Sequence, residues 1–269
     1  MVKRFVKIVI LFVLIILVLL GGWRMFNSLE RNKQFFSENI YNYVSPEAVE
    51  IISINKKYKS GDLLLYDTDL YDLIPIDKDF LLSPVIITKD KKENRVLLAK
   101  IKYEDQQEIL YFIKNYVAAP IREKNTRYKN TDIYTYSLQD GRFLSCTFYK
   151  GIFVASRSYK SIKSFIDTDT ENSFFKNYEI EHIDKQSPID IYIKVDNNVF
   201  VLDYAKDNDT IKFTGHIYDT PSRKFDSIKI GYEYLPYFIP LHDSLCIDKI
   251  DIMNENYPPE VKIVLNKIY

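Results

Sequence analysis

Ser53 and Lys56 have the S-x-x-K spacing, in which a lysine amine can activate a serine nucleophile. That chemistry requires the serine at the start of a helix. Ser53 instead lies in the run Ala48–Ile54 (AVEIISI), whose β-branched residues predict a strand. We therefore attribute the match to chance and assign no catalytic serine.

A group of aspartates that begins with Asp67, Asp69 and Asp72 could offer carboxylate oxygens to a calcium ion. An EF-hand loop needs Asp or Asn at its first, third and fifth positions, followed by Gly. Here Tyr71 occupies the fifth position and no Gly follows it. A solvated, turn-rich loop explains this segment better than a calcium site.

The chain has three histidines, His182, His216 and His242, and two cysteines, Cys146 and Cys246. Their spacing matches no zinc motif, and we expect the histidines to be structural or exposed. Cys146 and Cys246 are a candidate disulfide if the part of the chain that contains them lies in an oxidising compartment. The alternative is two buried thiols.

Composition and motifs argue against several functions. The 37 basic and 37 acidic residues balance, whereas a dedicated nucleic-acid-binding protein carries a basic excess. The seven glycines form no phosphate-binding loop, and the chain contains no G-x-S-x-G nucleophile elbow. The sequence predicts no enzyme activity, no metal, no cofactor, and no nucleotide or nucleic-acid partner.

The strongest functional signal is the hydrophobic stretch Phe5–Trp23, in which Lys7 is the one charged residue. As a helix rising about 1.5 Å per residue it would span roughly 28 Å, close to the ~30 Å hydrocarbon core of a bilayer. Trp23 would lie at the interface, where indoles are enriched. We expect an uncleaved signal anchor that contacts membrane lipid through Phe5, Ile8, Leu11, Leu14, Leu17, Leu20 and Trp23.

A cleaved signal peptide and a buried core helix are the alternatives to an anchor. Cleavage needs an A-x-A-like site after the apolar core. The core here ends Leu-Leu-Gly-Gly-Trp-Arg, which lacks that pattern. A core helix would have one polar face, and this stretch has none. Three basic residues, Lys3, Arg4 and Lys7, lie at its N-terminal end and three, Arg24, Arg31 and Lys33, follow it, so charge alone does not set the orientation. The basic start favours a cytoplasmic N-terminus and an extracytoplasmic body at the bacterial inner membrane.

The rest of the chain predicts an α+β domain. Its high aromatic content, 15%, favours antiparallel sheets. Ser45-Pro46 and Ser187-Pro188 each precede a strand-forming run, which suggests two related halves. The predicted domains are the anchor (1–24), a helical stalk (25–44) and the α+β domain (45–269), with halves 45–186 and 187–269.

Turn signals and apolar patterns locate the elements of this domain. Asp140-Gly141 and Lys150-Gly151 predict a three-strand meander, and the polar run Asp90–Asn94 predicts a hairpin. Apolar residues at a period of 3.6 predict a helix over Glu104–Val117. Shorter helices are expected after Ser158 and over 172–178. The predicted strands are 48–54, 81–88, 95–103, 132–138, 142–148, 152–155, 189–195, 199–204, 211–218, 227–234 and 261–268.

Several segments follow one another in a recognisable order. They are Ser45-Pro46-Glu47-Ala48, LLAKIKYEDQQEILYFI at 97–113, Tyr128–Tyr134, and FLSCTFYKGIFVASRSYKSIKSFI at 143–166. A meander ends at the small residue Ser156, runs into a helix, and is followed by a second helix bearing Phe174-Phe175. This order resembles that of uncharacterised membrane-anchored bacterial envelope proteins whose ectodomain is a domain of unknown function. The resemblance implies an envelope protein and supplies no activity or catalytic residue.

Together these features predict a single-pass envelope protein that binds or scaffolds other components. Its expected partners are membrane lipid and an envelope protein. A ligand- or peptide-sensing ectodomain and an envelope hydrolase with an unrecognised site are the alternatives. The Tyr-rich stretch Tyr232–Phe238 is a candidate contact surface, and packing of these rings in a core is the competing explanation.

Overall fold

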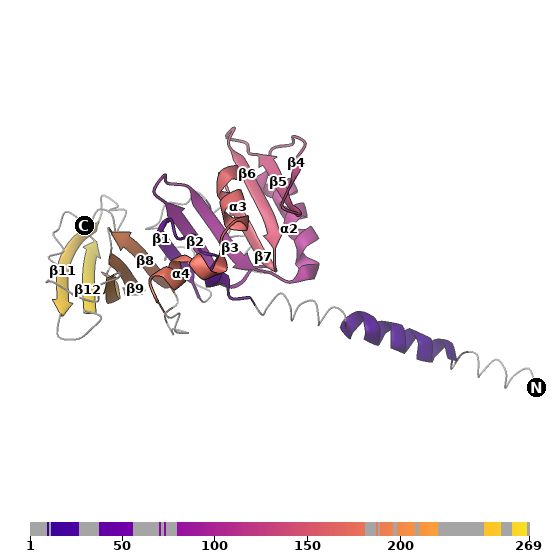
Figure 1. Ribbon diagram of the computed structural model, residues 1–269, viewed down its shortest axis with the longest axis horizontal. Helices are drawn as coiled ribbons and strands as arrows, with labels where there is room; N and C mark the ends of the chain where they lie inside the picture. The colour runs from indigo at the N-terminus through magenta and orange to yellow at the C-terminus, as the bar shows by residue number, and fades with distance from the viewer. Residues whose placement is uncertain are drawn as a thin grey trace, which may run out of the picture.

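The computed structural model describes residues 10, 12–26, 38–55, 70, 73, 80–180, 187, 189–195, 198–207, 210–219, 245–253 and 260–267 (Figure 1). Its described strands form one sheet in the order β11-β12-β10-β9-β8-β1-β2-β3-β7-β6-β5-β4. Every neighbouring pair in this sheet is antiparallel. The strands are β1 (Ala48–Ile54), β2 (Leu82–Asp90), β3 (Arg95–Lys100), β4 (Lys124–Tyr128), β5 (Thr131–Ser137), β6 (Phe143–Tyr149), β7 (Ile152–Ser156), β8 (Ile189–Val195), β9 (Asn198–Asp207), β10 (Thr210–Asp219), β11 (Leu245–Met253) and β12 (Glu260–Lys267).

Two meanders build the first seven strands. β1, β2 and β3 pair in sequence, and so do β4, β5, β6 and β7. The last strand of the second meander, β7, pairs with β3 and so joins the two meanders. The chain crosses from β3 to β4 through η4 (Tyr103–Asp105), α2 (Gln106–Phe112) and η5 (Ile113–Val117).

Helices pack on the sheet in two places, and each place has its own hydrophobic core. In the first core, Ile109 of α2 and Ile113 of η5 are fully buried. The second core contains buried residues of η1 (Ile40–Tyr43), α3 (Tyr159–Ile166) and α4 (Phe174–Asn177). α3 lies across β3, β7 and β6 (Figure 1).

Alternation along the central strands explains why the sheet supports two cores. In β8, Ile189, Ile191 and Ile193 belong to the first core, whereas Tyr192 belongs to the second. Successive side chains of a strand point to opposite faces, so one strand contributes to both cores. β7 is buried at all five positions. Each fully buried Ile or Phe contributes about 1.5–3 kcal/mol of hydrophobic stabilisation.

A buried polar cluster lies where β1 pairs with β8. Ser53 is opposite Asp190 in the register, and both are fully buried. The Tyr41 hydroxyl lies 2.6 Å from Ser53 Oγ, and Ser53 Oγ donates to Asn55 Oδ1 at 2.9 Å. Asn55 Nδ2 donates to Asp190 Oδ2 at 2.8 Å and to the carbonyl oxygen of Ser187 at 3.2 Å. A buried carboxylate needs such donors, because removing it from water is otherwise costly.

The faces that β1 and β8 bury do not support superposing Ser45-Pro46 on Ser187-Pro188. The superposition shifts the numbering by 187 − 45 = 142 residues and places Ile52 on Lys194. Ile52 lies in the first core, as does Ile193, so Lys194 points to the opposite face from Ile52. The presence of two related halves therefore stays a prediction, and this superposition does not support it.

The predicted α+β class is confirmed in its coarse form, an antiparallel sheet with a few helices. The predicted helix Glu104–Val117 is present but is not one α-helix. Its last turn is π-helical, with the Ala118 amide donating to the carbonyl of Ile113 at 2.8 Å. β4 and β11 were not predicted, and β4 (KNTRY) shows why. It is a polar edge strand whose side chains are half-buried or exposed, so it has no apolar alternation.

The structure describes the C-terminal end of the predicted stalk. Ile40, Tyr41 and Tyr43 are buried in the second core, because Tyr41 packs edge-on against Phe175 of α4 with 4.9 Å between ring centroids. Residues 12–26 are helical, a range that covers the C-terminal half of the predicted anchor and the first two residues of the predicted stalk. No helix in the described part of the chain is both long and apolar enough to cross a membrane. Phe5, Ile8, Leu11 and the predicted strand 227–234 lie outside the described residues.

Asn55→Ala tests the role of the β1·β8 cluster. The substitution removes a donor from the buried Asp190 carboxylate, and we expect it to lower the free energy of unfolding by about 1–3 kcal/mol. Denaturant unfolding monitored by circular dichroism measures the change. Asn125→Ala, at an exposed position of β4, is the matched control and should shift stability by less than ~0.5 kcal/mol. Equal effects of the two variants would show that the cluster does not stabilise the sheet.

Candidate functional site

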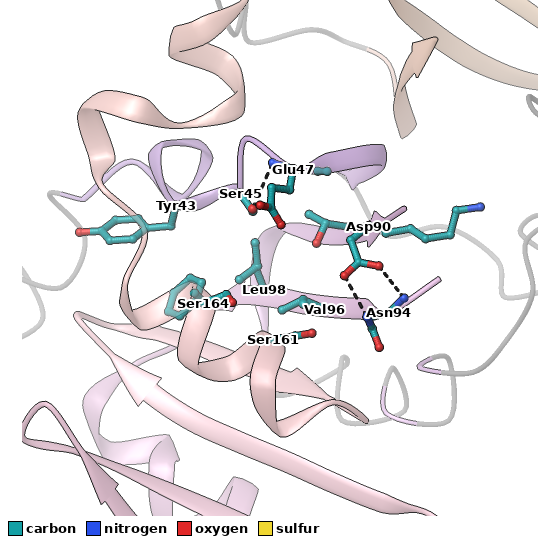
Figure 2. A pocket seen from close by; sticks show the side chains of 13 residues that line it. Tyr43, Ser45, Glu47, Asp90, Asn94, Val96, Leu98, Ser161 and Ser164 are labelled. Atoms are coloured by element: carbon teal, nitrogen blue, oxygen red, sulfur yellow. Dashed lines mark hydrogen bonds between the residues drawn. The ribbon is translucent and has the colours of Figure 1, made fainter. Parts of the chain in front are cut away.

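A small cavity lies between α3, the start of β1 and the β2–β3 hairpin. Its volume is about 60 Å³, room for one or two water molecules. Figure 2 shows Glu47, Asp90 and Asn94 on one side and Ser161 and Ser164 of α3 on the other. The buried Leu98 and Phe165 side chains and the partly buried Val96 also line it, so its lining is both polar and apolar.

A larger groove of about 650 Å³ continues from this cavity and shares five lining residues with it. We call it the lysine groove. Its volume is within the range of about 300–1,000 Å³ typical of sites that hold small-molecule ligands. The lysine groove is lined by Pro46, Glu47, Asp90, Lys91, Lys92, Asn94, Ser158, Lys160, Ser161, Ser164 and Lys194.

Asp90 organises the hairpin side of the lysine groove. Its carboxylate accepts hydrogen bonds from the Lys92 amide at 2.8 Å, the Asn94 amide at 2.9 Å and Asn94 Nδ2 at 2.9 Å. These bonds hold a turn in which Glu93 has a positive φ of 64°. A left-handed backbone costs a non-glycine residue about 1–2 kcal/mol, which the Asp90 bonds offset. The turn thereby presents Lys91 and Lys92 at the rim.

α3 forms the opposite side, and its serines face the lysine groove. Ser158 is the N-cap, and its Oγ accepts from the Ser161 amide at 3.3 Å. Ser158, Ser161 and Ser164 are three residues apart, so they share one face of the helix. Ile162 and Phe165, on the other face, are buried against the sheet. The hydrophobic packing of α3 thus fixes where the hydroxyls point.

Tyr43, beneath the small cavity, is held in place from both sides. Its hydroxyl donates to Glu38 Oε2 at 2.9 Å, and the Lys150 ammonium lies 5.5 Å from its ring centroid. Burial raises the pKa of the Tyr43 phenol, so it stays neutral and serves as a donor. It stacks in the second core with Phe165 at 5.8 Å between centroids.

The lysine groove carries more positive than negative charge. Four lysines line it, against the two carboxylates of Glu47 and Asp90. Within the described residues, Lys91, Lys92 and Lys160 make no ion pair. The Lys194 ammonium lies 5.0 Å from the ring centroid of Tyr178. Since the whole chain is neutral, this is a local concentration of cations.

The candidate catalytic and metal-binding residues that the structure describes do not line the lysine groove. Ser53 is in a strand as predicted and bonds to Tyr41 and Asn55. His216 is on β10, and its buried Nδ1 has no hydrogen-bond partner among the described atoms. No group of three His, Cys, Asp or Glu side chains in the described part of the chain could hold a metal ion. Lys56, Asp67, Asp69, Asp72, His182, His242 and Tyr232–Phe238 lie outside the described residues.

Cys146 is a free, fully buried thiol in β6. Cys246 is on β11, whose side chains lie outside the described part. Eight strands separate β6 from β11 in the sheet order, and the candidate disulfide between the two cysteines stays a prediction. Cys146 packs in the first core as a small hydrophobic residue, the alternative that the sequence left open.

Sequence reasoning missed the lysine groove itself. Asp90–Asn94 was identified as a turn and Ser158 as a helix cap, but no signal connected them. Comparisons with protein-family models, with curated proteins and with solved structures find no match to this chain. The site therefore has to be interpreted from its own geometry.

Asp90→Ala tests whether Asp90 organises the rim. Loss of three hydrogen bonds should speed hydrogen exchange at the Lys92 and Asn94 amides and lower stability by roughly 1–2 kcal/mol. Mass-spectrometric hydrogen exchange measures the first effect. Asp132→Ala, at an exposed position of β5, should leave both amides unchanged. Unchanged exchange in Asp90→Ala would remove the carboxylate from this role.

Thiol reactivity tests the state of Cys146. In a Cys246→Ala variant, a thiol reagent should leave native Cys146 unmodified and should modify it after denaturation. Burial raises the pKa of the Cys146 thiol, so the reactive thiolate is scarce as well as inaccessible. The unaltered chain, denatured without reductant, should yield both of its two thiols. A yield of none would demonstrate the disulfide.

Proposed function

We propose that this protein is a membrane-anchored binding module of the bacterial envelope. Residues 5–23 hold it in the cytoplasmic membrane with the N-terminus inside, and the α+β body lies outside. The body binds another envelope component at the lysine groove. Binding is proposed in place of catalysis because the groove offers ammonium and hydroxyl donors, and Asp90 is already committed to its turn.

The observation that supports the proposed membrane anchor is the exposure of the apolar side chains of the N-terminal helix. Every side chain from Phe12 to Leu20 is apolar, and each is between 42% and 73% exposed. Nine consecutive positions cover all sides of a helix, so this apolar surface has no polar face to turn toward water. Trp23, 68% exposed, follows at the place expected for an interfacial indole. A lipid environment would bury this surface at ~25 cal/mol per Å².

A chain with Leu14→Arg and Leu17→Arg tests the anchor. Arginine near the centre of a membrane helix costs about 2.5–3.5 kcal/mol, so the double variant should lose most of its association with lipid vesicles. Flotation of the full chain with phosphatidylcholine vesicles on a density gradient measures this, and the unaltered chain should float.

The matched control carries the same charge change on the body. Tyr111→Arg and Ile121→Arg replace two apolar side chains that are 66% and 63% exposed. This control should float like the unaltered chain. If the unaltered chain stays at the bottom of the gradient, the anchor proposal fails.

A further inference from the structure

The lysine groove has an excess of hydrogen-bond donors. Each lysine ammonium carries three donors and no acceptor. Ser161 and Ser164 have hydroxyls that make no hydrogen bond to described residues. Of the two carboxylates, Asp90 is already accepting three bonds within its turn. A ligand that complements this surface must supply acceptors and negative charge.

The distribution of the lysines indicates the size of the ligand. Lys91 and Lys92 come from the β2–β3 turn, Lys160 from the first turn of α3 and Lys194 from the end of β8. They surround about 650 Å³, more than a single phosphate group would fill. A chain with anions at regular intervals matches lysines that come from three separate elements better than a single anion does. Lysine and serine side chains are both common donors to phosphate oxygens.

The aromatic residues argue against a nucleic acid as this ligand. Single-stranded nucleic acids bind by stacking bases on exposed aromatic rings. Tyr43 and Phe165, which line the adjoining small cavity, are 2% and 4% exposed and pack in the second core. Tyr178, whose ring lies beside the Lys194 ammonium, is half-buried. None of the residues that line the lysine groove is aromatic, so its lining offers donors to phosphate oxygens and no ring on which a base could stack.

We propose that the lysine groove binds a linear polyanion built of phosphate groups, held by Lys91, Lys92, Lys160 and Lys194 with Ser161 and Ser164. This inference deepens the proposed function and rests on it, because it names the class of envelope component that the body binds. The contacts are ionic, so affinity falls as salt concentration rises.

The test uses the full chain in phosphatidylcholine nanodiscs, with short-chain inorganic polyphosphate as the probe and calorimetry as the readout. The unaltered chain should bind at low salt. Lys91→Gln with Lys92→Gln should weaken the dissociation constant about tenfold or more, since two charge-assisted contacts are lost. Ser161→Ala with Ser164→Ala, which leaves the charge unchanged, should weaken it by about two- to fivefold.

Lys124→Gln with Lys212→Gln is the matched control. These exposed lysines lie on β4 and β10, outside the lysine groove, and the change in net charge is the same. This variant should bind within about twofold of the unaltered chain. Circular dichroism confirms that each variant is folded. No binding by the unaltered chain, or equal losses in the two lysine variants, would overturn the inference.

Two further arms separate this inference from the proposed function. In the first arm, nanodiscs that contain phosphatidylglycerol offer anionic headgroups in place of the polymer. If the chain binds these headgroups more tightly than polyphosphate, and if this binding depends on Lys91 and Lys92, the proposal of a polymeric ligand fails. A photo-crosslinking residue at position 92 that captures a protein in cells, without polyphosphate binding, would leave the binding module standing and refute the phosphate ligand. Failure of vesicle flotation with polyphosphate binding intact would refute the anchor alone.

Discussion

The pairing of β1 with β8 is the contact on which the rest of the structure depends. It joins the first seven strands to β8–β12, and both cores continue across it. The neighbouring β8·β9 pairing places Asp190 beside Asp203, and like charges on adjacent strands are unfavourable. Donation from Asn55 to Asp190 offsets part of that cost. The β1·β8 register ends at Glu50 and Ile193, so Lys194 lies beside the first residues of β1.

The lysine groove is a consequence of this arrangement. Its three sides are the segment before β1, the β2–β3 turn and the polar face of α3, and each is fixed by packing elsewhere. α3 is held by Ile162, Phe165 and Ile166, and the turn by the carboxylate of Asp90. A rigid scaffold therefore presents flexible lysine side chains, which suits a ligand recognised by charge and spacing more than by shape.

Local signals in the sequence predicted most of the central sheet. Asp140-Gly141 and Lys150-Gly151 located a meander, and both glycines have the positive φ that tight turns require, 80° and 77°. The polar edge strand β4 was not predicted, because an exposed strand needs no periodic apolar residues. The lysine groove was not predicted for a different reason. Lys91, Lys160 and Lys194 are far apart in sequence, and each alone has the properties of a solvated surface charge. Only the β1·β8 register and the position of α3 bring them together.

Hydrogen exchange on the full chain in vesicles tests the central claim most directly, because one experiment observes the anchor and the lysine groove. Without ligand, amides of residues 12–26 should be protected in vesicles compared with the Leu14→Arg, Leu17→Arg chain. On addition of polyphosphate, exchange should slow at 91–94 and 158–164 and stay constant at 124–128. Ligand-induced protection that spreads evenly over the body, or none at either groove segment, would contradict a membrane-held module that binds phosphate chains in the lysine groove.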